Sequence, residues 1–187
     1  MIYHVAAAED IEKVLALHYR YQVDSIAPED KKDGFVTTPF TAGQLRDLIE
    51  KEQGLFIAKD GDEVVAYVMV ASWRFWSAWP MFAHMIENLG NLTYRGQKLS
   101  VENSCQYGPV CIDKRFRGSG VLEGIFEFAR ARTAVRFPVL VTFINKQNPR
   151  SFAAHTRKLG LEVIAEFDYK ENHYYELAYE TAKPLPL

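Results

Sequence analysis

The chain has 187 residues, 48% of them hydrophobic and 25% charged, which is ordinary for one soluble domain with a substantial core. Its net charge of −2 and the lack of a long basic run make nucleic acid an unexpected partner. The longest uncharged apolar stretch, residues 75–86, is too short to span a membrane and contains Pro80. We therefore expect no membrane partner and, because the chain does not open with a secretory leader, a cytoplasmic protein.

The cysteines and histidines show no pattern of a metal site. Cys105 and Cys111 would lie roughly 20 Å apart along one extended strand, which is too far for a disulfide. The five histidines have no ligand spacing with them. We expect two reduced thiols and no bound metal.

The hydrophobic pattern predicts strands and helices in alternation. In chain order the predicted elements are a strand at 2–5, a helix at 8–21, a polar loop at 28–34, a helix at 41–53, a hairpin of strands at 55–59 and 63–73, a helix at 77–89, a long strand that includes 102–112, a helix from 121, a strand at 139–144, a helix from 148 to 159, and a closing hairpin at 162–168 and 173–179. Thr41 and Gln44 make a capping box for the second helix, and Gly54 suits its end. Helices interleaved with hairpins predict an α/β fold with a mixed sheet in a single domain, residues 1–187.

Residues 73–92 concentrate all three tryptophans and form a predicted helical insertion. Ser77 is the expected cap of a helix that ends at Leu89, with Pro80 tolerated in its first turn. This helix packs on the sheet, or its aromatic residues line a substrate pocket or a subunit interface in a homodimer.

The stretch from Tyr107 to Arg132 combines a strand end, a basic glycine turn and a helix. The strand end at 110–112 is mostly apolar, and apolar residues recur at helical spacing from Val121. Between them stand Lys114, Arg115, Phe116, Arg117, Gly118, Ser119 and Gly120. Glycines let the main chain turn sharply toward a ligand, and the positive end of the following helix attracts an anion. The segment is therefore predicted to bind a phosphate group.

Two common phosphate-binding motifs do not fit this turn. A P-loop needs Lys followed by Ser or Thr after its last glycine, where this chain has Val121 and Leu122. The dinucleotide fingerprint needs a glycine where this chain has Glu123. A nucleotide-binding protein of either type is therefore disfavoured.

The turn instead resembles the acyl-CoA-binding segment of the GNAT N-acetyltransferase superfamily. Arg115-Phe-Arg-Gly118-Ser-Gly120 matches the family pattern Arg/Gln-x-x-Gly-x-Gly/Ala between a strand and a helix. The stretch from Arg117 to Leu122 matches it one step along, with Leu122 where a small residue is usual. A second segment, Asn148-Pro-Arg-Ser151 followed by Leu159-Gly160-Leu161, is similar to a family motif on the helix after the next strand, with one residue more between asparagine and glycine.

The resemblance implies a central twisted mixed sheet of about seven strands flanked by helices, with the strands that hold Val110 and Val141 adjacent and parallel. It also implies transfer of an acetyl group from acetyl-CoA to an amine of a small molecule or peptide, by direct attack in a ternary complex. The residues implied to contact acetyl-CoA are Val110, Cys111, Ile112, Arg115, Arg117, Gly118, Ser119, Gly120, Val121, Leu122, Asn148 and Ser151. The alternative is a non-catalytic acyl-CoA-binding or regulatory domain with the same fold.

Three residues are candidates for the catalytic proton transfers. Glu102 is expected on the strand before the turn, where family members often hold a carboxylate base; otherwise it is an exposed strand residue. Tyr107, on the same strand, belongs either to the site or to the core. Counted from the start of the second motif, His155 falls where many members have a tyrosine acid, whereas counted from its end that position is Thr156. A threonine hydroxyl is too weak an acid, so His155 is the candidate, and its alternative is a surface histidine.

Overall fold

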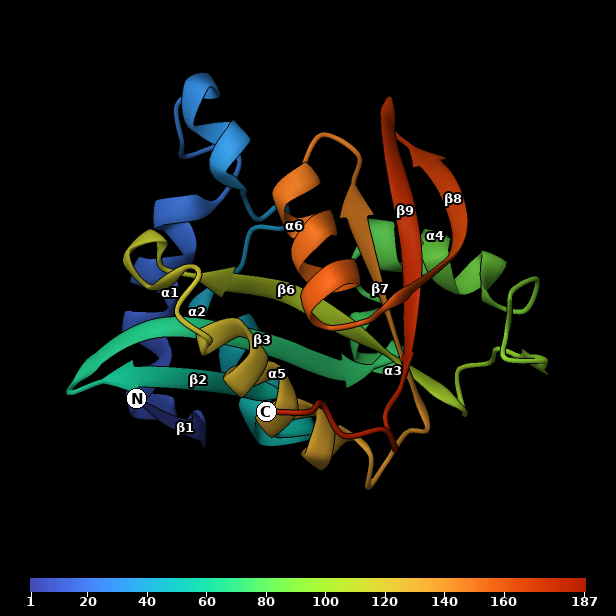
Figure 1. The fold of residues 1–187 in the computed structure, drawn as a ribbon, viewed down its shortest axis with the longest axis horizontal. Helices are drawn as coiled ribbons and strands as arrows, with labels where there is room; N and C mark the ends of the chain where they lie inside the picture. Colours follow the sequence, from blue (N-terminus) through green and yellow to red (C-terminus); the bar gives the residue numbers. More distant parts are fainter.

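Seven strands form one mixed sheet, on which the rest of the chain is arranged (Figure 1). The computed structural model describes residues 1–187, apart from the side chains of Lys32 and Asp33. In spatial order the strands are β1 (Ile2–Val5), β2 (Leu55–Asp60), β3 (Glu63–Ser72), β6 (Ser104–Ile112), β7 (Val139–Asn145), β9 (Asn172–Glu180) and β8 (Glu162–Tyr169). A separate small hairpin joins β4 (Thr93–Tyr94) and β5 (Gln97–Lys98). The predicted mixed sheet of about seven strands is confirmed.

Helices cover both faces of the sheet. The α-helices are α1 (Ile11–Tyr21), α2 (Ala42–Asp47), α3 (Trp73–Trp76), α4 (Pro80–Leu89), α5 (Val121–Thr133) and α6 (Pro149–Ala153). Shorter helical turns are η1 (Ala8–Asp10), η2 (Pro28–Asp33), η3 (Leu48–Glu52), η4 (Lys114–Phe116) and η5 (Ala154–Lys158). In the part of the chain that the structure describes, no helix is long and apolar enough to cross a membrane.

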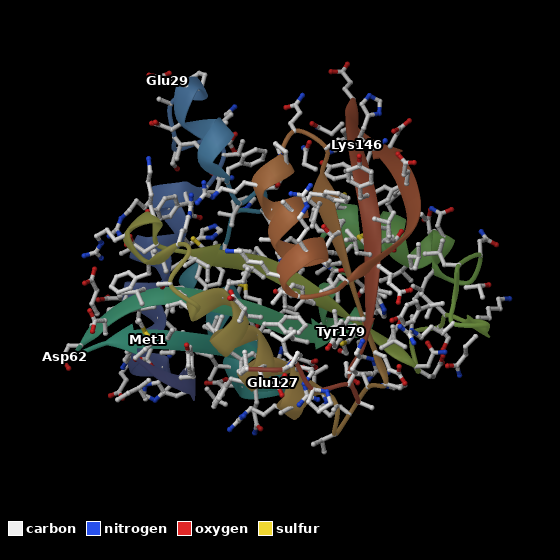
Figure 2. All side chains as sticks on the ribbon, viewed as in Figure 1. Met1, Glu29, Asp62, Glu127, Lys146 and Tyr179 are labelled. Carbon is white, nitrogen blue, oxygen red and sulfur yellow. The ribbon has the colours of Figure 1, made fainter. Side chains whose placement is uncertain are left out.

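Buried apolar side chains form one cluster on each side of the sheet. Figure 2 draws the described side chains on the ribbon. The α5 and α6 helices lie in front of the sheet in Figure 1, and α1, α2 and α4 lie behind it. We call these the α5/α6 face and the α1/α4 face. Both faces are covered, so the central strand β3 is buried from Val64 to Ala71 instead of alternating between buried and exposed.

Among the described strands, β6 and β7 alone run parallel, and they pair only briefly. Ser104–Gln106 pair with Val139–Val141, and beyond these residues the two strands diverge. On its other side β6 stays paired with β3 as far as Ile112. The expected parallel neighbours are confirmed, although Val110 lies past the paired segment.

The second predicted helix begins as expected, but Gly54 after it has a different role from the predicted one of ending the helix. Thr41 and Gln44 form the expected capping box, with bonds of 3.0 and 3.2 Å. The helix continues from α2 into the π-helical turn η3, and Gln53 carries the left-handed φ of 50°. A Cβ on Gly54 would lie 1.7 Å from the carbonyl oxygen of Val70, so this glycine is required by the close approach of β3.

The tryptophan-rich segment folds differently from its prediction. Ser72, not Ser77, caps the first helical turn, accepting a bond of 3.3 Å from the Phe75 amide, and α4 begins only at Pro80. The indoles of Trp73 and Trp76 are fully buried and donate to Ser104 Oγ and the Gln106 carbonyl of β6. These tertiary bonds decide where the strand ends. The predicted loop at 28–34 is likewise mostly the 3₁₀ helix η2.

A carboxyl group is buried on the α1/α4 face. Glu176 in β9 is 4% exposed, and its Oε2 has no hydrogen-bond partner among the described residues. The strand register places it directly opposite Phe143 of β7. Burial raises the pKa of Glu176 to about 7, because the carboxylate loses its hydration there.

Replacing Glu176 with glutamine is expected to stabilise the protein by about 2–3 kcal/mol at pH 8. Because the folded-state pKa lies above the unfolded one, ionisation removes stability as the pH rises from about 4.5 to about 7. The difference between the variant and the wild type should therefore shrink below about 1 kcal/mol at pH 5. Urea unfolding at both pH values measures it, with Glu180→Gln on the same strand as the half-exposed control. A Glu176→Gln variant less stable than wild type at pH 8 would contradict the unpartnered carboxylate.

Candidate active site

A cleft of about 360 Å³ opens where β6 and β7 diverge. It is lined by Tyr21, Gly34, Phe35, Val36, Val110, Cys111, Ile112, Phe116, Arg117, Gly118, Leu122, Asn148, Arg150, Ser151, Ala153, Ala154, His155, Arg157 and Lys158. A smaller cavity of about 60 Å³ adjoins it, and its walls include Thr37, Thr38, Tyr107, Gly108, Thr142 and Phe143. Both share Phe35, Val36, Val110, Asn148, Ser151 and His155. The two cavities are therefore neighbours across the gap in the sheet, and we call them the main cleft and the gap cavity.

The glycine turn stands at one end of the main cleft. Gly118 and Gly120 have left-handed φ angles of 76° and 89°, which residues with a Cβ rarely adopt. Within the described structure, a Cβ on either glycine would meet no atom within 4 Å, so the space above the turn is open. Gly120 is the N-cap of α5, whose first amide groups have no partner inside the helix and carry its positive dipole end. The turn can therefore receive an anion with main-chain donors.

The edge of β6 forms a second row of main-chain groups. From Val110 to Ile112 the strand is paired with β3 on one side, while its other side faces the main cleft instead of β7. Apart from the Ile112 carbonyl, which accepts from Arg117, main-chain groups on that side are available to an extended ligand lying between the two strands, as an added strand would be.

The two predicted phosphate-binding arginines have different surroundings. Arg117 lines the main cleft, where its Nε donates to the Ile112 carbonyl at 3.0 Å and its guanidinium lies 5.0 Å from the Tyr21 ring. Arg115 is not among the residues that line this cleft, and it is bound to Asp113 at 3.1 Å and to Glu63. Its contact with a phosphate stays a prediction.

Asp113, which the sequence analysis missed, holds the turn in place. It is 1% exposed, caps η4, and is bound to Arg20 of α1 at 2.5 Å and to Arg115. Burial opposes its ionisation, but the bonds from Arg115 and the charge of Arg20 outweigh it and lower the pKa of Asp113. The only sequence signal for this role is its place directly after the strand, because its partner Arg20 is distant in the chain.

The remaining predicted cofactor residues divide into two groups. Val110, Cys111, Ile112, Gly118, Leu122, Asn148 and Ser151 line the main cleft. Ser119 bonds within the turn to the Phe116 carbonyl, and Val121, the first residue of α5, is buried. Asn148 accepts from the Ser151 amide at 3.3 Å and donates to the Phe35 carbonyl at 3.1 Å. It therefore ties the N-terminal segment around Phe35 to the start of α6.

The structure resolves the choice between His155 and Thr156. The extra residue of the second motif is accommodated in the π-helical turn η5, where the Leu159 amide donates to the Ala154 carbonyl five residues earlier. His155 consequently lies at the gap, lining both cavities at 6% exposure. The hydroxyl of Thr156 bonds back to the Phe152 carbonyl at 2.7 Å.

His155 and Tyr107 form a buried pair at the gap. His155 Nδ1 lies 2.8 Å from the Ser151 carbonyl oxygen, which can only accept, so Nδ1 carries the proton. Nε2 lies 3.1 Å from the Tyr107 hydroxyl and accepts from it. Burial lowers the pKa of His155, against the opposing effect of the Ser151 bond, and raises the pKa of Tyr107. Both side chains are therefore neutral at pH 7.

Glu102 is not part of this site, which corrects its predicted place on the strand. It lies in a turn closed by bonds between Ser100 and Asn103, and β6 begins only at Ser104. Glu102 lines a separate surface hollow with Lys98 and Leu99. The described residues contain no group of three or more His, Cys, Asp or Glu side chains that could hold a metal ion.

No protein-family model matches the sequence, and no curated protein matches it. Solved structures do resemble its fold. An N-acetyltransferase from Staphylococcus aureus Mu50 superposes with a TM-score of 0.61 and 16% identity, covering 96% of this chain and 98% of that one. The Salmonella typhimurium protein yncA, solved with its cofactor acetyl-CoA, gives 0.65 and 13%, covering 98% and 96%. The acetyltransferase of the GNAT family from Streptococcus pneumoniae gives 0.63 and 13%, covering 96% and 98%.

These superpositions extend over nearly the whole chain. The chain has the GNAT N-acetyltransferase fold, as the resemblance of its two motifs implied.

We expect NMR to show His155 as a neutral imidazole with its proton on Nδ1 at pH 7. Burial disfavours the charged form, and the Ser151 carbonyl needs a donor. Long-range ¹H–¹⁵N spectra distinguish the two tautomers and the imidazolium, with exposed His173 as an internal reference. An imidazolium, or a proton on Nε2, would contradict this arrangement.

Proposed function

We propose that the protein is an acetyl-CoA-dependent N-acetyltransferase that acts on an amine of a small molecule or peptide. The observation that carries this proposal is the neighbouring pair of cavities across the sheet gap, with an anion-binding turn at one end and the His155–Tyr107 pair at the gap. A thioester at the gap would thus be reachable by a nucleophile from the gap cavity.

The residues of the main cleft fit the parts of acetyl-CoA. Amides of the Gly118–Leu122 turn bind the pyrophosphate, assisted by the α5 dipole and by Arg117. The open edge of β6 at Val110–Ile112 bonds to the amide groups of the pantetheine arm. When bound, acetyl-CoA supplies an activated acyl group as a thioester.

Direct transfer to the amine is supported by the state of the nearest thiol. Cys111 lines the main cleft, but burial raises its pKa to about 12, so almost no thiolate forms at neutral pH. A covalent acetyl-cysteine step is therefore disfavoured. The amine nitrogen forms the C–N bond to the acetyl carbon while the C–S bond breaks, giving the amide and the CoA thiolate.

His155 and Tyr107 transfer the proton from the amine to the CoA thiolate in this reaction. The amine loses one proton and the CoA thiolate gains one, so a group at the gap must take it up and release it. The acceptor is His155 Nε2: the Tyr107 hydroxyl passes its own proton to Nε2 as its oxygen takes one from the amine. The lowered pKa of His155 makes the resulting imidazolium a good acid toward the thiolate.

Gly120→Val should weaken acetyl-CoA binding by more than about tenfold. Its side chain would enter the open space above the turn and strain a left-handed backbone. Gly61→Val is the matched control, because Gly61 also has a positive φ, of 61°, and open surroundings but lies in the β2–β3 turn. Calorimetric titration measures both; equal acetyl-CoA affinity in the two variants would argue against this placement of the pyrophosphate.

His155→Ala should lower kcat by about 100- to 10,000-fold and leave acetyl-CoA affinity nearly unchanged, since it removes the proton relay but no phosphate contact. The measurement is thiol release with the best acceptor from a panel of primary amines. Tyr107→Phe tests the hydroxyl with the ring kept, and His173→Ala is the surface control. A loss smaller than about threefold would mean that water carries the proton.

The second candidate is a non-catalytic acyl-CoA-binding domain, and one observation favours it: Glu102, the expected carboxylate base, lies in a turn outside the site. Acetyl-CoA binding without thiol release across the amine panel would support this alternative over the enzyme.

A further inference from the structure

Two buried oxygen atoms on the α1/α4 face have no hydrogen-bond partner among the described residues: Glu176 Oε2 and Gln106 Oε1. Gln106 in β6 is fully buried, and its Nε2 donates to the Tyr107 carbonyl at 2.9 Å. A buried acceptor without a donor costs free energy and is rare in folded proteins. Two such acceptors on one face point to a ligand that brings N–H donors.

The two acceptors flank β7 near the gap. In the strand register Gln106 is the partner of Val141, and Glu176 is the partner of Phe143. Val141 and Phe143 are two residues apart and share one face, so both acceptors face the same layer. With neighbouring strands about 4.8 Å apart, their Cα atoms are separated by roughly 10 Å or slightly more. The side chains of Val141 and Phe143 lie between the two acceptors on this face.

The gap cavity reaches this layer. Phe143 belongs to its wall, and Cβ atoms of directly opposite residues such as Phe143 and Glu176 lie about 5 Å apart. Gly108 also belongs to the wall, and a Cβ built on it would lie 4.0 Å from Gln106 Nε2. Glu176 and Gln106 are therefore each next to a residue that lines the gap cavity, Phe143 and Gly108 respectively.

Aromatic rings make up the rest of the surroundings. The ring centroid of Phe143 lies 5.7 Å from that of Phe82 and 5.5 Å from that of Tyr174. Phe82 contacts Trp76 at 4.8 Å, and Trp76 contacts Trp79 at 5.1 Å. Aromatic faces attract cations and pack against apolar groups. A carboxyl group set among such rings has the chemistry that recognises an ammonium ion.

We propose that Glu176, with Gln106 as a second acceptor, binds the ammonium form of the acceptor substrate, which is a cationic primary amine with an apolar or aromatic body. Before the transfer the ammonium gives one proton to the Glu176 carboxylate, so that the neutral amine attacks the thioester. This inference rests on the proposed function of the cleft. An ammonium group offers a positive charge and three donors, which match an ionised carboxylate and an amide oxygen that otherwise remain unpaired. The ligand would thereby offset the cost of a carboxyl group in the core.

The test compares phenethylamine with 2-phenylethanol, which has nearly the same size but no charge at pH 7.5. Calorimetric titration of the full chain should show about tenfold or more tighter binding of phenethylamine, a difference expected for a buried charge-assisted bond. Glu176→Gln should reduce this preference to about twofold or less, while Glu180→Gln, on the same strand, should keep it. Circular dichroism confirms that each variant is folded.

Three results would overturn the proposal: equal binding of the two probes by the wild type, an unchanged preference in Glu176→Gln, or no saturable binding of phenethylamine. Titration of the same samples with acetyl-CoA keeps this test separate from the proposed function. Loss of the amine preference in Glu176→Gln with intact acetyl-CoA binding supports the ammonium site. A wild type that does not bind acetyl-CoA contradicts the proposed function, whatever the probes show.

Discussion

The separation of β6 from β7 after a short parallel pairing is the constraint on which the candidate site depends. Gln106 and Val141 are the last paired residues, and Gly108 and Pro109 follow in β6. Proline has no amide hydrogen and cannot continue a ladder, while the absence of a Cβ at Gly108 lets the chain pass close to Thr142. The strand beyond them remains held by β3, so its other edge faces open space. Main-chain groups that would normally be used within the sheet are thereby available to a ligand.

The N-terminal half of the chain stabilises this opening from outside the two motifs. Arg20 of α1 binds Asp113 beneath the glycine turn, and the Tyr21 hydroxyl accepts from the Lys114 amide at 2.8 Å. On the other side, Asn148 holds the Phe35 carbonyl. These bonds join elements that are about a hundred residues apart. Residues from both halves of the chain therefore form the cleft, although the glycine turn itself is local.

Burial of polar groups is concentrated on either side of the gap. His155 and Tyr107 are buried on the α5/α6 side as a satisfied neutral pair, whereas Glu176 and Gln106 are buried on the α1/α4 side with oxygen atoms that have no partner among the described residues. The hydrogen bonds of His155 and Tyr107 are satisfied within the protein without a ligand. The oxygen atoms of Glu176 and Gln106 lower the stability of the free protein. Groups that lower stability without a structural role are typical of binding sites. In the function that we propose, proton transfer belongs to the first side and substrate recognition to the second.

Features with local causes could be predicted from the sequence. The glycine turn, the helix from Val121 and the capping box at Thr41 depend on neighbouring residues, whose preferences can be read along the chain. The order of strands and helices follows from hydrophobic periodicity, and the two motifs indicated the fold. His155 was within reach for the same reason, since its helix position follows from the motif. The motif left a choice between His155 and Thr156, because it contains one extra residue. That residue is accommodated in the π-helical turn η5.

Features with distant partners required the folded chain. Trp73 and Trp76 end β3 early because their indoles bond to β6, which no local pattern around Ser77 reveals. Glu102 leaves the strand because β6 begins where its pairing with β7 begins, and Arg115 forms ion pairs with Glu63 and Asp113, the first of which is distant in the chain. Gly54 is needed for the passage of β3, not for a helix end. Local propensities determine which elements form, whereas hydrogen bonds and ion pairs between distant elements determine where each side chain finally lies.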